Sequence, residues 1–136
     1  MLEASEIPPT YGTDPSLVVG VIAGGDVAIQ RAVENAEDDV DGGAAAMAEL
    51  GVGEADTVVG IASSGRTPYV LGALAEARRC GALRIGLTIN AGSAVGAAAD
   101  IAIEVVVGPS SSRAPRGCGR GPARSSCSTC SARWPW

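Results

Sequence analysis

The chain has 136 residues, of which 46% are hydrophobic, and its formal net charge is −5. It contains neither histidine nor lysine, which excludes a Ser-His-Asp triad, histidine-ligated metals, Schiff-base chemistry and a P-loop lysine. No apolar run is long enough for a transmembrane helix, and no signal-peptide pattern is present. We therefore expect a soluble, cytoplasmic protein.

The charge is distributed unevenly along the chain. All 15 acidic residues lie before Pro109, whereas half of the ten arginines lie after it. The part after Pro109 also contains three of the four cysteines and both tryptophans. Two different compositions are joined near Gly108-Pro109, so we interpret residues 1–109 and 110–136 separately.

In residues 1–109, short apolar runs alternate with segments in which apolar residues recur at the spacing of a helix. The runs are typical of buried parallel strands, and they cover residues 17–23, 56–62, 83–89 and 101–107. Helices are expected between them, over residues 26–36, 44–50, 69–80 and 93–99. This alternation predicts an α/β fold in which a parallel sheet has helices on both faces.

The segment Ser63-Ser64-Gly65-Arg66-Thr67 follows the second predicted strand and precedes the helix that opens at Pro68. In parallel sheets, ligands bind beyond the carboxyl ends of the strands. The hydroxyls of Ser64 and Thr67, together with backbone N–H groups freed by Gly65, could hold a phosphate there. The alternative interpretation is a helix cap with no ligand.

Carboxylates are the remaining candidates for general acid–base chemistry. Glu6 lies before Pro8-Pro9 in an N-terminal segment that we expect to be irregular, and Glu37 lies in the acidic cluster at 34–39. By composition alone, both are interpreted equally well as solvated surface residues.

The last 27 residues carry a Cys127-x-x-Cys130 motif and a further cysteine, Cys118. A zinc site would need a fourth ligand, and the remaining cysteine belongs to a predicted helix. Arginine among glycine and serine is compatible with nucleic-acid binding or with disorder. We expect disorder over 110–136, with no metal and no nucleic acid bound.

Five strings in residues 2–109 are found together in one protein family. They are SEIPPTYG at 5–12, IAGG at 22–25, AVENAED at 32–38, SSGRTPYV at 63–70 and ADIAIE at 99–104. With these strings the chain resembles the N-acetylmuramic acid 6-phosphate etherases, which are sugar isomerase (SIS) domain proteins of cell-wall recycling. The glucokinase regulatory protein is a related protein without enzymatic activity.

The resemblance implies a three-layer, flavodoxin-like SIS fold and a carbon–oxygen lyase. Its reaction would cleave the D-lactyl ether of N-acetylmuramic acid 6-phosphate to N-acetylglucosamine 6-phosphate and D-lactate, by elimination and water addition. The resemblance also implies a homodimer and no metal or organic cofactor. By it, Glu6 would be the acid, Glu37 would be the base that takes the C2 proton, and Ser64, Gly65 and Thr67 would hold the substrate phosphate.

Two alternatives to the etherase function stay open. One is a catalytically inactive, phosphosugar-binding regulatory SIS module, and the other is a fragment without function. In the family, a glycine- and serine-rich phosphosugar loop on a strand and helix precedes the segment that matches 5–12. We therefore expect residues 1–109 to form a SIS domain that is incomplete at its N-terminus.

The part after Pro109 also departs from the family. If residues 121–136 are translated in a frame offset by one nucleotide, permitted codons allow T-G-Q-K-L-V-L-N-M-L-G-A-L-A-M, which matches the segment that the family carries there. We therefore interpret 110–136 as a frameshifted tail that is not part of the fold.

Overall fold

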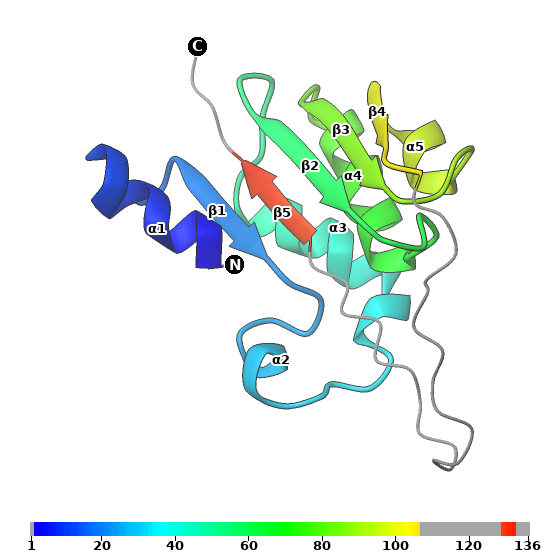
Figure 1. The fold of residues 1–136 in the computed structure, drawn as a ribbon, viewed down its shortest axis with the longest axis horizontal. Coiled ribbons are helices and arrows are strands. Elements are labelled where there is room, and N and C mark those ends of the chain that lie inside the picture. Colours follow the sequence, from blue (N-terminus) through cyan, green and yellow to red (C-terminus); the bar gives the residue numbers. More distant parts are fainter. Residues whose placement is uncertain (1, 107–128, 133–136) are drawn as a thin grey trace.

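The computed structural model describes residues 2–106 and 129–132 (Figure 1). The helices are α1 (Leu2–Tyr11), α2 (Val27–Gln30), the 3-10 helix η1 (Ala36–Asp38), α3 (Val40–Glu49), α4 (Pro68–Arg79) and α5 (Ala94–Ala98). The strands are β1 (Val18–Val21), β2 (Thr57–Ile61), β3 (Leu83–Thr88), β4 (Ile101–Glu104) and β5 (Thr129–Ala132). No helix in this part of the chain has the length and apolar character needed to span a membrane.

The strands form one sheet in the order β1-β5-β2-β3-β4. Strands β2, β3 and β4 are parallel, with Val59 paired to Ile85 and Leu87 paired to Ile103. Strand β5 is antiparallel to both of its neighbours, so β1 runs in the same direction as β2. The four predicted strands are therefore all present and share one direction, which confirms the α/β class.

The core lies between this sheet and the helices that connect its strands. Gly60 and Gly86 are paired across β2 and β3. A Cβ at Gly60 would lie 2.8 Å from Val70 of α4, and one at Gly86 would lie 2.9 Å from the carbonyl oxygen of Val95 in α5. Both helices therefore pack on the same face of the sheet, as Figure 1 also shows. The fully buried side chains that fill this layer include those of Met47, Val58, Val70, Leu74 and Val95.

Helix α3 joins this layer because small residues let it approach α4 closely. A Cβ at Gly43 would lie 2.0 Å from the carbonyl oxygen of Tyr69, and one at Gly72 would lie 2.0 Å from the carbonyl oxygen of Val40. Only glycine allows two backbones to come this near. The high glycine content of the sequence therefore serves helix packing as well as turns.

Two of the local predictions were wrong. The N-terminal segment is not irregular but forms α1, which contains Pro8 and Pro9 and ends where the Gly12 N–H donates to the Pro8 carbonyl at 2.8 Å. The predicted helix over 26–36 is only the four-residue α2. Arg31 after it is extended, and Asn35 adopts a left-handed conformation with φ of 60°, which no α-helix continues through.

Four residues of the segment 110–136, for which the sequence analysis expects disorder, belong to the described part of the chain. Residues 129–132 form β5 inside the sheet, between β1 and β2. The other residues of that segment, including Cys118 and Cys127, lie outside the described residues. Because β1 and β2 leave a gap one strand wide, the backbone groups facing that gap need a partner, and β5 provides it.

Candidate functional site

The turn at 63–67 links the carboxyl end of β2 to the first turn of α4. Gly65 has a φ of +67°, and its N–H donates to the Ala62 carbonyl at 3.0 Å. The Arg66 N–H donates to Ser64 Oγ at 3.3 Å. Pro68 then starts the helix, as its position in the sequence predicts. The turn thus presents Ser64 and Arg66 outward, while Gly65 and Thr67 are buried.

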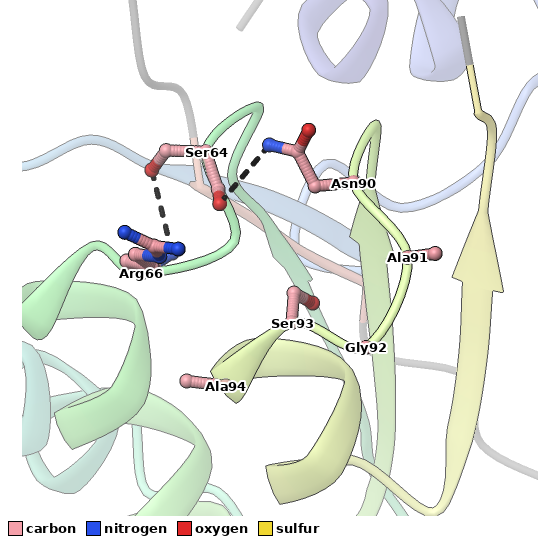
Figure 2. Close-up of a pocket in the computed structure, with 7 residues that line it drawn as sticks. All are labelled: Ser64, Arg66, Asn90, Ala91, Gly92, Ser93 and Ala94. Atoms are coloured by element: carbon pink, nitrogen blue, oxygen red, sulfur yellow. Dashed lines mark hydrogen bonds between the residues drawn. The ribbon is translucent and has the colours of Figure 1, made fainter.

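A second loop, which follows β3, is joined directly to this turn. Asn90 Nδ2 donates to the carbonyl oxygens of Ser63 at 3.1 Å and Ser64 at 3.3 Å, and the second of these bonds is drawn in Figure 2. The Val95 N–H donates to the Gly65 carbonyl at 3.0 Å. A Cβ at Gly65 would lie 2.3 Å from the Cβ of Ser93. The two loops are therefore in direct van der Waals and hydrogen-bonding contact.

The second loop is also held by hydrogen bonds to Thr88 of β3 and to Glu104 of β4. Thr88 Oγ1 donates to the Asn90 carbonyl at 3.1 Å, and Ser93 Oγ donates to Thr88 Oγ1 at 3.3 Å. The Gly92 N–H donates to Glu104 Oε1 at 2.8 Å. Charge-assisted bonds of this type are stronger than neutral ones, so Glu104 holds the loop against the end of β4.

Between the two loops lies an open pocket of about 610 Å³. Figure 2 shows Ser64 and Arg66 on one side of it and the loop from Asn90 to Ala94 on the other. Its lining consists of Ser64, Arg66, Asn90, Ala91, Gly92, Ser93 and Ala94. Arg66 is the only charged residue among the described residues that line it, so the pocket favours an anionic ligand.

The structure brings only one of the five predicted site residues to the pocket wall. Ser64 lines the pocket, whereas Gly65 and Thr67 lie buried behind it. Glu6 is exposed on α1, which contacts β1, and Glu37 is half-buried on η1, which contacts α4. Neither glutamate lines this pocket.

Asn90 and Ser93 were missed by the sequence reasoning. The signal that could have found them is their position. Residues 90–93 directly follow the predicted strand 83–89, just as residues 63–67 follow the predicted strand 56–62. Adjacent parallel strands end at the same edge of a sheet, so their loops meet there.

A second cavity, of about 420 Å³, lies between the end of β1 and α3, with Gly20, Val21, Ala46 and Tyr69 in its lining. Tyr69 is buried at 6% exposure. This burial raises the pKa of its phenol, and the negative charges of Asp39 and Glu49 raise it further. The phenol therefore stays neutral and can donate a hydrogen bond at physiological pH.

The described residues contain no cluster of three or more metal-ligating side chains. Cys80 of the predicted helix is half-buried with a free thiol. The zinc interpretation rests on cysteines of 110–136, whose side chains the structure does not describe.

Comparison with known proteins gives two results. The family model of the glucokinase regulatory protein N-terminal SIS domain matches residues 4–78, which is more than half of the chain. N-acetylmuramic acid 6-phosphate etherases also match: that of Caldanaerobacter subterraneus subsp. tengcongensis is 54% identical over 109 residues, 80% of this chain and 36% of the relative. Those of Streptomyces avermitilis and Porphyromonas gingivalis are 55% and 54% identical, again over 80% of this chain and over 35% and 40% of the relatives.

The chain therefore spans a little over a third of the length of the relatives that it matches. The resemblance that the sequence motifs indicated is confirmed by these identities. The matched family model, the parallel α/β sheet and the loops at its carboxyl edge lead to the same conclusion. The chain belongs to the SIS-domain family.

Proposed function

We propose that the pocket between the two loops binds the phosphate of N-acetylmuramic acid 6-phosphate, as part of a protein that cleaves the lactyl ether of this sugar. The observation that carries the proposal is the pocket itself, a polar, arginine-bearing site at the carboxyl edge of a parallel sheet. The similarity to N-acetylmuramic acid 6-phosphate etherases, at about 55% identity, supports the choice of substrate.

Ser64 is well prepared to contact a phosphate. Its Oγ already accepts a hydrogen bond from the Arg66 N–H, which orients the hydroxyl and leaves its O–H to donate to a phosphate oxygen. The Ser93 hydroxyl, in contrast, donates to Thr88 and accepts from the Gly96 N–H. Arg66 adds a positive charge, and the adjacent N-terminus of the 12-residue α4 adds the positive end of a helix dipole.

The proposed reaction needs a base and an acid. Glu37 would remove the proton from C2, and Glu6 would protonate the ether oxygen as the C3–O bond breaks, which releases lactate. Water then adds across the C2–C3 double bond, with its proton going to C2 and its hydroxyl to C3. The contact of η1 with α4 supports Glu37 for this role, because α4 begins directly after the phosphate-binding turn.

The intact protein would act in the cytoplasm, as a homodimer, in the recycling of cell-wall amino sugars. The support for this part of the proposal is the family resemblance and the names of the relatives.

The phosphate role is tested by Ser64→Ala in this chain, with binding of the 6-phosphorylated sugar and of its dephosphorylated analogue measured by calorimetry. The variant should bind the phosphorylated sugar about ten- to a hundredfold more weakly, because a charge-assisted hydrogen bond is lost. The analogue should bind as before. The matched control is Ser63→Ala, whose side chain does not line the pocket. Equal losses for both sugars would leave the turn with a structural role only.

The two carboxylates are tested in a full-length chimera that joins residues 1–109 to the remaining parts of the Caldanaerobacter relative. Glu6→Gln and Glu37→Gln should each lower lactate release by about a hundredfold or more. Only Glu37→Gln should also abolish exchange of the C2 proton with solvent. Near-normal release in both variants would refute the two-carboxylate mechanism.

A second candidate function is a phosphosugar-binding module without catalysis. It is favoured by the match to the glucokinase regulatory protein model, and by the fact that none of the described residues lining the pocket carries a carboxylate. Tight binding of the sugar phosphate by the chimera, without release of lactate, would support it.

A further inference from the structure

The turn after β2 directs three consecutive carbonyl oxygens toward the loop that follows β3. The carbonyls of Ser63 and Ser64 accept from Asn90 Nδ2 at 3.1 Å and 3.3 Å, and the carbonyl of Gly65 accepts from the Val95 N–H at 3.0 Å. All three donors come from the second loop and the start of α5. The side of the turn that faces this loop therefore consists of acceptors, each of which already has a donor.

Asn90 supplies two of these three hydrogen bonds from a single atom. An asparagine amide nitrogen carries two hydrogens, and here each has its own carbonyl acceptor. Because a carbonyl oxygen only accepts, the nitrogen of the amide and not its oxygen faces the turn, and Figure 2 shows it pointing toward Ser64. Aspartate has the same shape, but its ionised carboxylate has no hydrogen to donate. The two bonds are therefore specific for an amide.

The backbone that carries Asn90 is fixed independently of its side chain. Thr88 of β3 is only 1% exposed, and its Oγ1 donates to the Asn90 carbonyl at 3.1 Å. Further along the loop, the Gly92 N–H donates to Glu104 Oε1 at 2.8 Å. Asn90 itself is exposed and does not belong to the core. A substitution at this position therefore removes the two side-chain hydrogen bonds, while the loop keeps its other anchors.

The two carbonyls matter because they lie beside a pocket with little positive charge. Arg66 is the only charged residue among the described residues that line this pocket. A carbonyl oxygen is the negative end of a peptide dipole of about 3.5 D, so two carbonyls without donors at Ser63 and Ser64 would oppose the attraction of Arg66 for an anion. The amide of Asn90 reduces this opposition before a ligand arrives, which lowers the cost of binding.

We propose that Asn90 makes this pocket selective for a phosphate over a hydroxyl group at the same place on a ligand. It acts as a positioning residue: its amide occupies the carbonyls of Ser63 and Ser64 and leaves the Ser64 hydroxyl and the Arg66 guanidinium to meet the anion. Asn90 need not touch the ligand for this effect. The inference rests on the proposed phosphate site and adds the reason why an anion is preferred there.

The test measures binding to the full 136-residue chain by calorimetry. The probes are inorganic phosphate, the 6-phosphorylated sugar and its dephosphorylated analogue. Asn90→Ala removes both donors and should weaken binding of the two phosphate-bearing probes about tenfold, because two carbonyls are left without their partner. Asn90→Asp also places a carboxylate against them and should weaken binding about a hundredfold. The analogue should bind to both variants as it does to the native chain.

A matched control separates the loss of the donors from the effect of an added charge. Ala91→Asp places a carboxylate on the neighbouring exposed residue of the same pocket lining, and the alanine side chain that it replaces makes no hydrogen bond. It should weaken binding of phosphate only about threefold to fivefold, since the charge of an exposed side chain is screened by solvent and salt.

Three results would overturn the inference. Phosphate binding by Asn90→Ala that is as tight as in the native chain would show that the two carbonyls do not affect an anion. An effect of Ala91→Asp as large as that of Asn90→Asp would leave added charge as the cause. A loss of affinity in Asn90→Ala that is equal for the phosphorylated sugar and its analogue would leave Asn90 with a structural role only.

The probes also separate this inference from the proposed function. If Asn90→Ala weakens binding of inorganic phosphate, and the native chain binds the phosphorylated sugar no better than inorganic phosphate, the role of Asn90 stands and the proposed substrate is wrong. If the native chain and Asn90→Ala bind the phosphorylated sugar equally tightly, the substrate stands and the role of Asn90 is wrong. A native chain that binds neither phosphate-bearing probe overturns both.

Discussion

The two halves of the sheet are built in different ways. In the half formed by β2, β3 and β4, each strand is joined to the next by a helix that packs on both, and the fully buried side chains of the core lie here. In the half formed by β1 and β5, neighbouring strands come from opposite ends of the chain, and no residue of α2 is buried. A continuous sheet therefore does not imply a continuous core: close packing follows the helical connections.

We expect the largest loss of stability from Leu74→Ala, in the half of the sheet that holds the core. Leu74 of α4 is fully buried against the sheet, so truncation removes apolar contacts and leaves a cavity. The free energy of unfolding should fall by about 2–5 kcal/mol, as measured by urea denaturation. Val27→Ala, at a position that is 61% exposed, should change it by less than about 0.5 kcal/mol.

The second prediction concerns the contact between α3 and α4. Gly72→Ala would place a methyl group 2.0 Å from the Val40 carbonyl oxygen, and neither backbone can move away without separating the helices. We expect a loss of about 3 kcal/mol in the free energy of unfolding, the upper end for overpacking. Gly53→Ala is the control, since a Cβ there meets nothing within 4 Å. Equal effects of the two substitutions would show that the helices are not in close contact.

The third prediction compares the same substitution in both halves. Val58 of β2 is 1% exposed and Val18 of β1 is 8% exposed. Val58→Ala should cost about 2 kcal/mol in the free energy of unfolding, because the site is enclosed by α4 and cannot collapse. Val18→Ala should cost clearly less, since the small residues around β1 can adjust. If Val18→Ala were the more damaging, the core would extend through β1.

The smallest expected effect is a pH dependence of stability, caused by the contact between Arg84 of β3 and Asp100, which directly precedes β4. Arg84 donates from its guanidinium and its backbone N–H to Asp100, and these bonds, the side-chain bond first, lower the pKa of Asp100 from its ordinary value of 3.8. A lowered folded-state pKa gives stability that is complete above the ordinary value and is lost as the pH falls below it. The melting temperature of the native chain should therefore fall more steeply below pH 3.8 than that of Asp100→Asn. Parallel curves would contradict the prediction.

The sequence predicted the half built from local connections best. The apolar runs at 56–62 and 83–89 and the proline at 68 are local signals, and β2, β3 and α4 follow them closely. The end of α2 at Gln30 and the helical form of the segment around Pro8-Pro9 did not follow from the local apolar spacing, which predicted a longer helix and an irregular segment. The placement of 129–132 in the sheet could not be predicted, because it depends on a gap between two distant strands.

Only part of the candidate site could be predicted from the sequence. Ser64 follows from the rule that loops after parallel strands bind ligands, and it lines the pocket. Asn90 and Ser93 belong to the next loop, and their importance comes from hydrogen bonds and contacts across the two loops. The catalytic roles of Glu6 and Glu37 stay predictions, because the structure does not bring either carboxylate to the pocket.

The contact between Gly65 and Ser93 has a consequence for how this edge of the molecule can be varied. A Cβ at residue 65 would meet the Cβ of Ser93 at 2.3 Å, and the left-handed φ of Gly65 independently disfavours any larger residue. The two loops cannot be diversified one at a time, since a change of backbone in either displaces the other. Libraries aimed at a new ligand specificity should therefore exchange 63–67 and 89–93 together. They should keep Glu104, because its carboxylate accepts the hydrogen bond that holds the second loop.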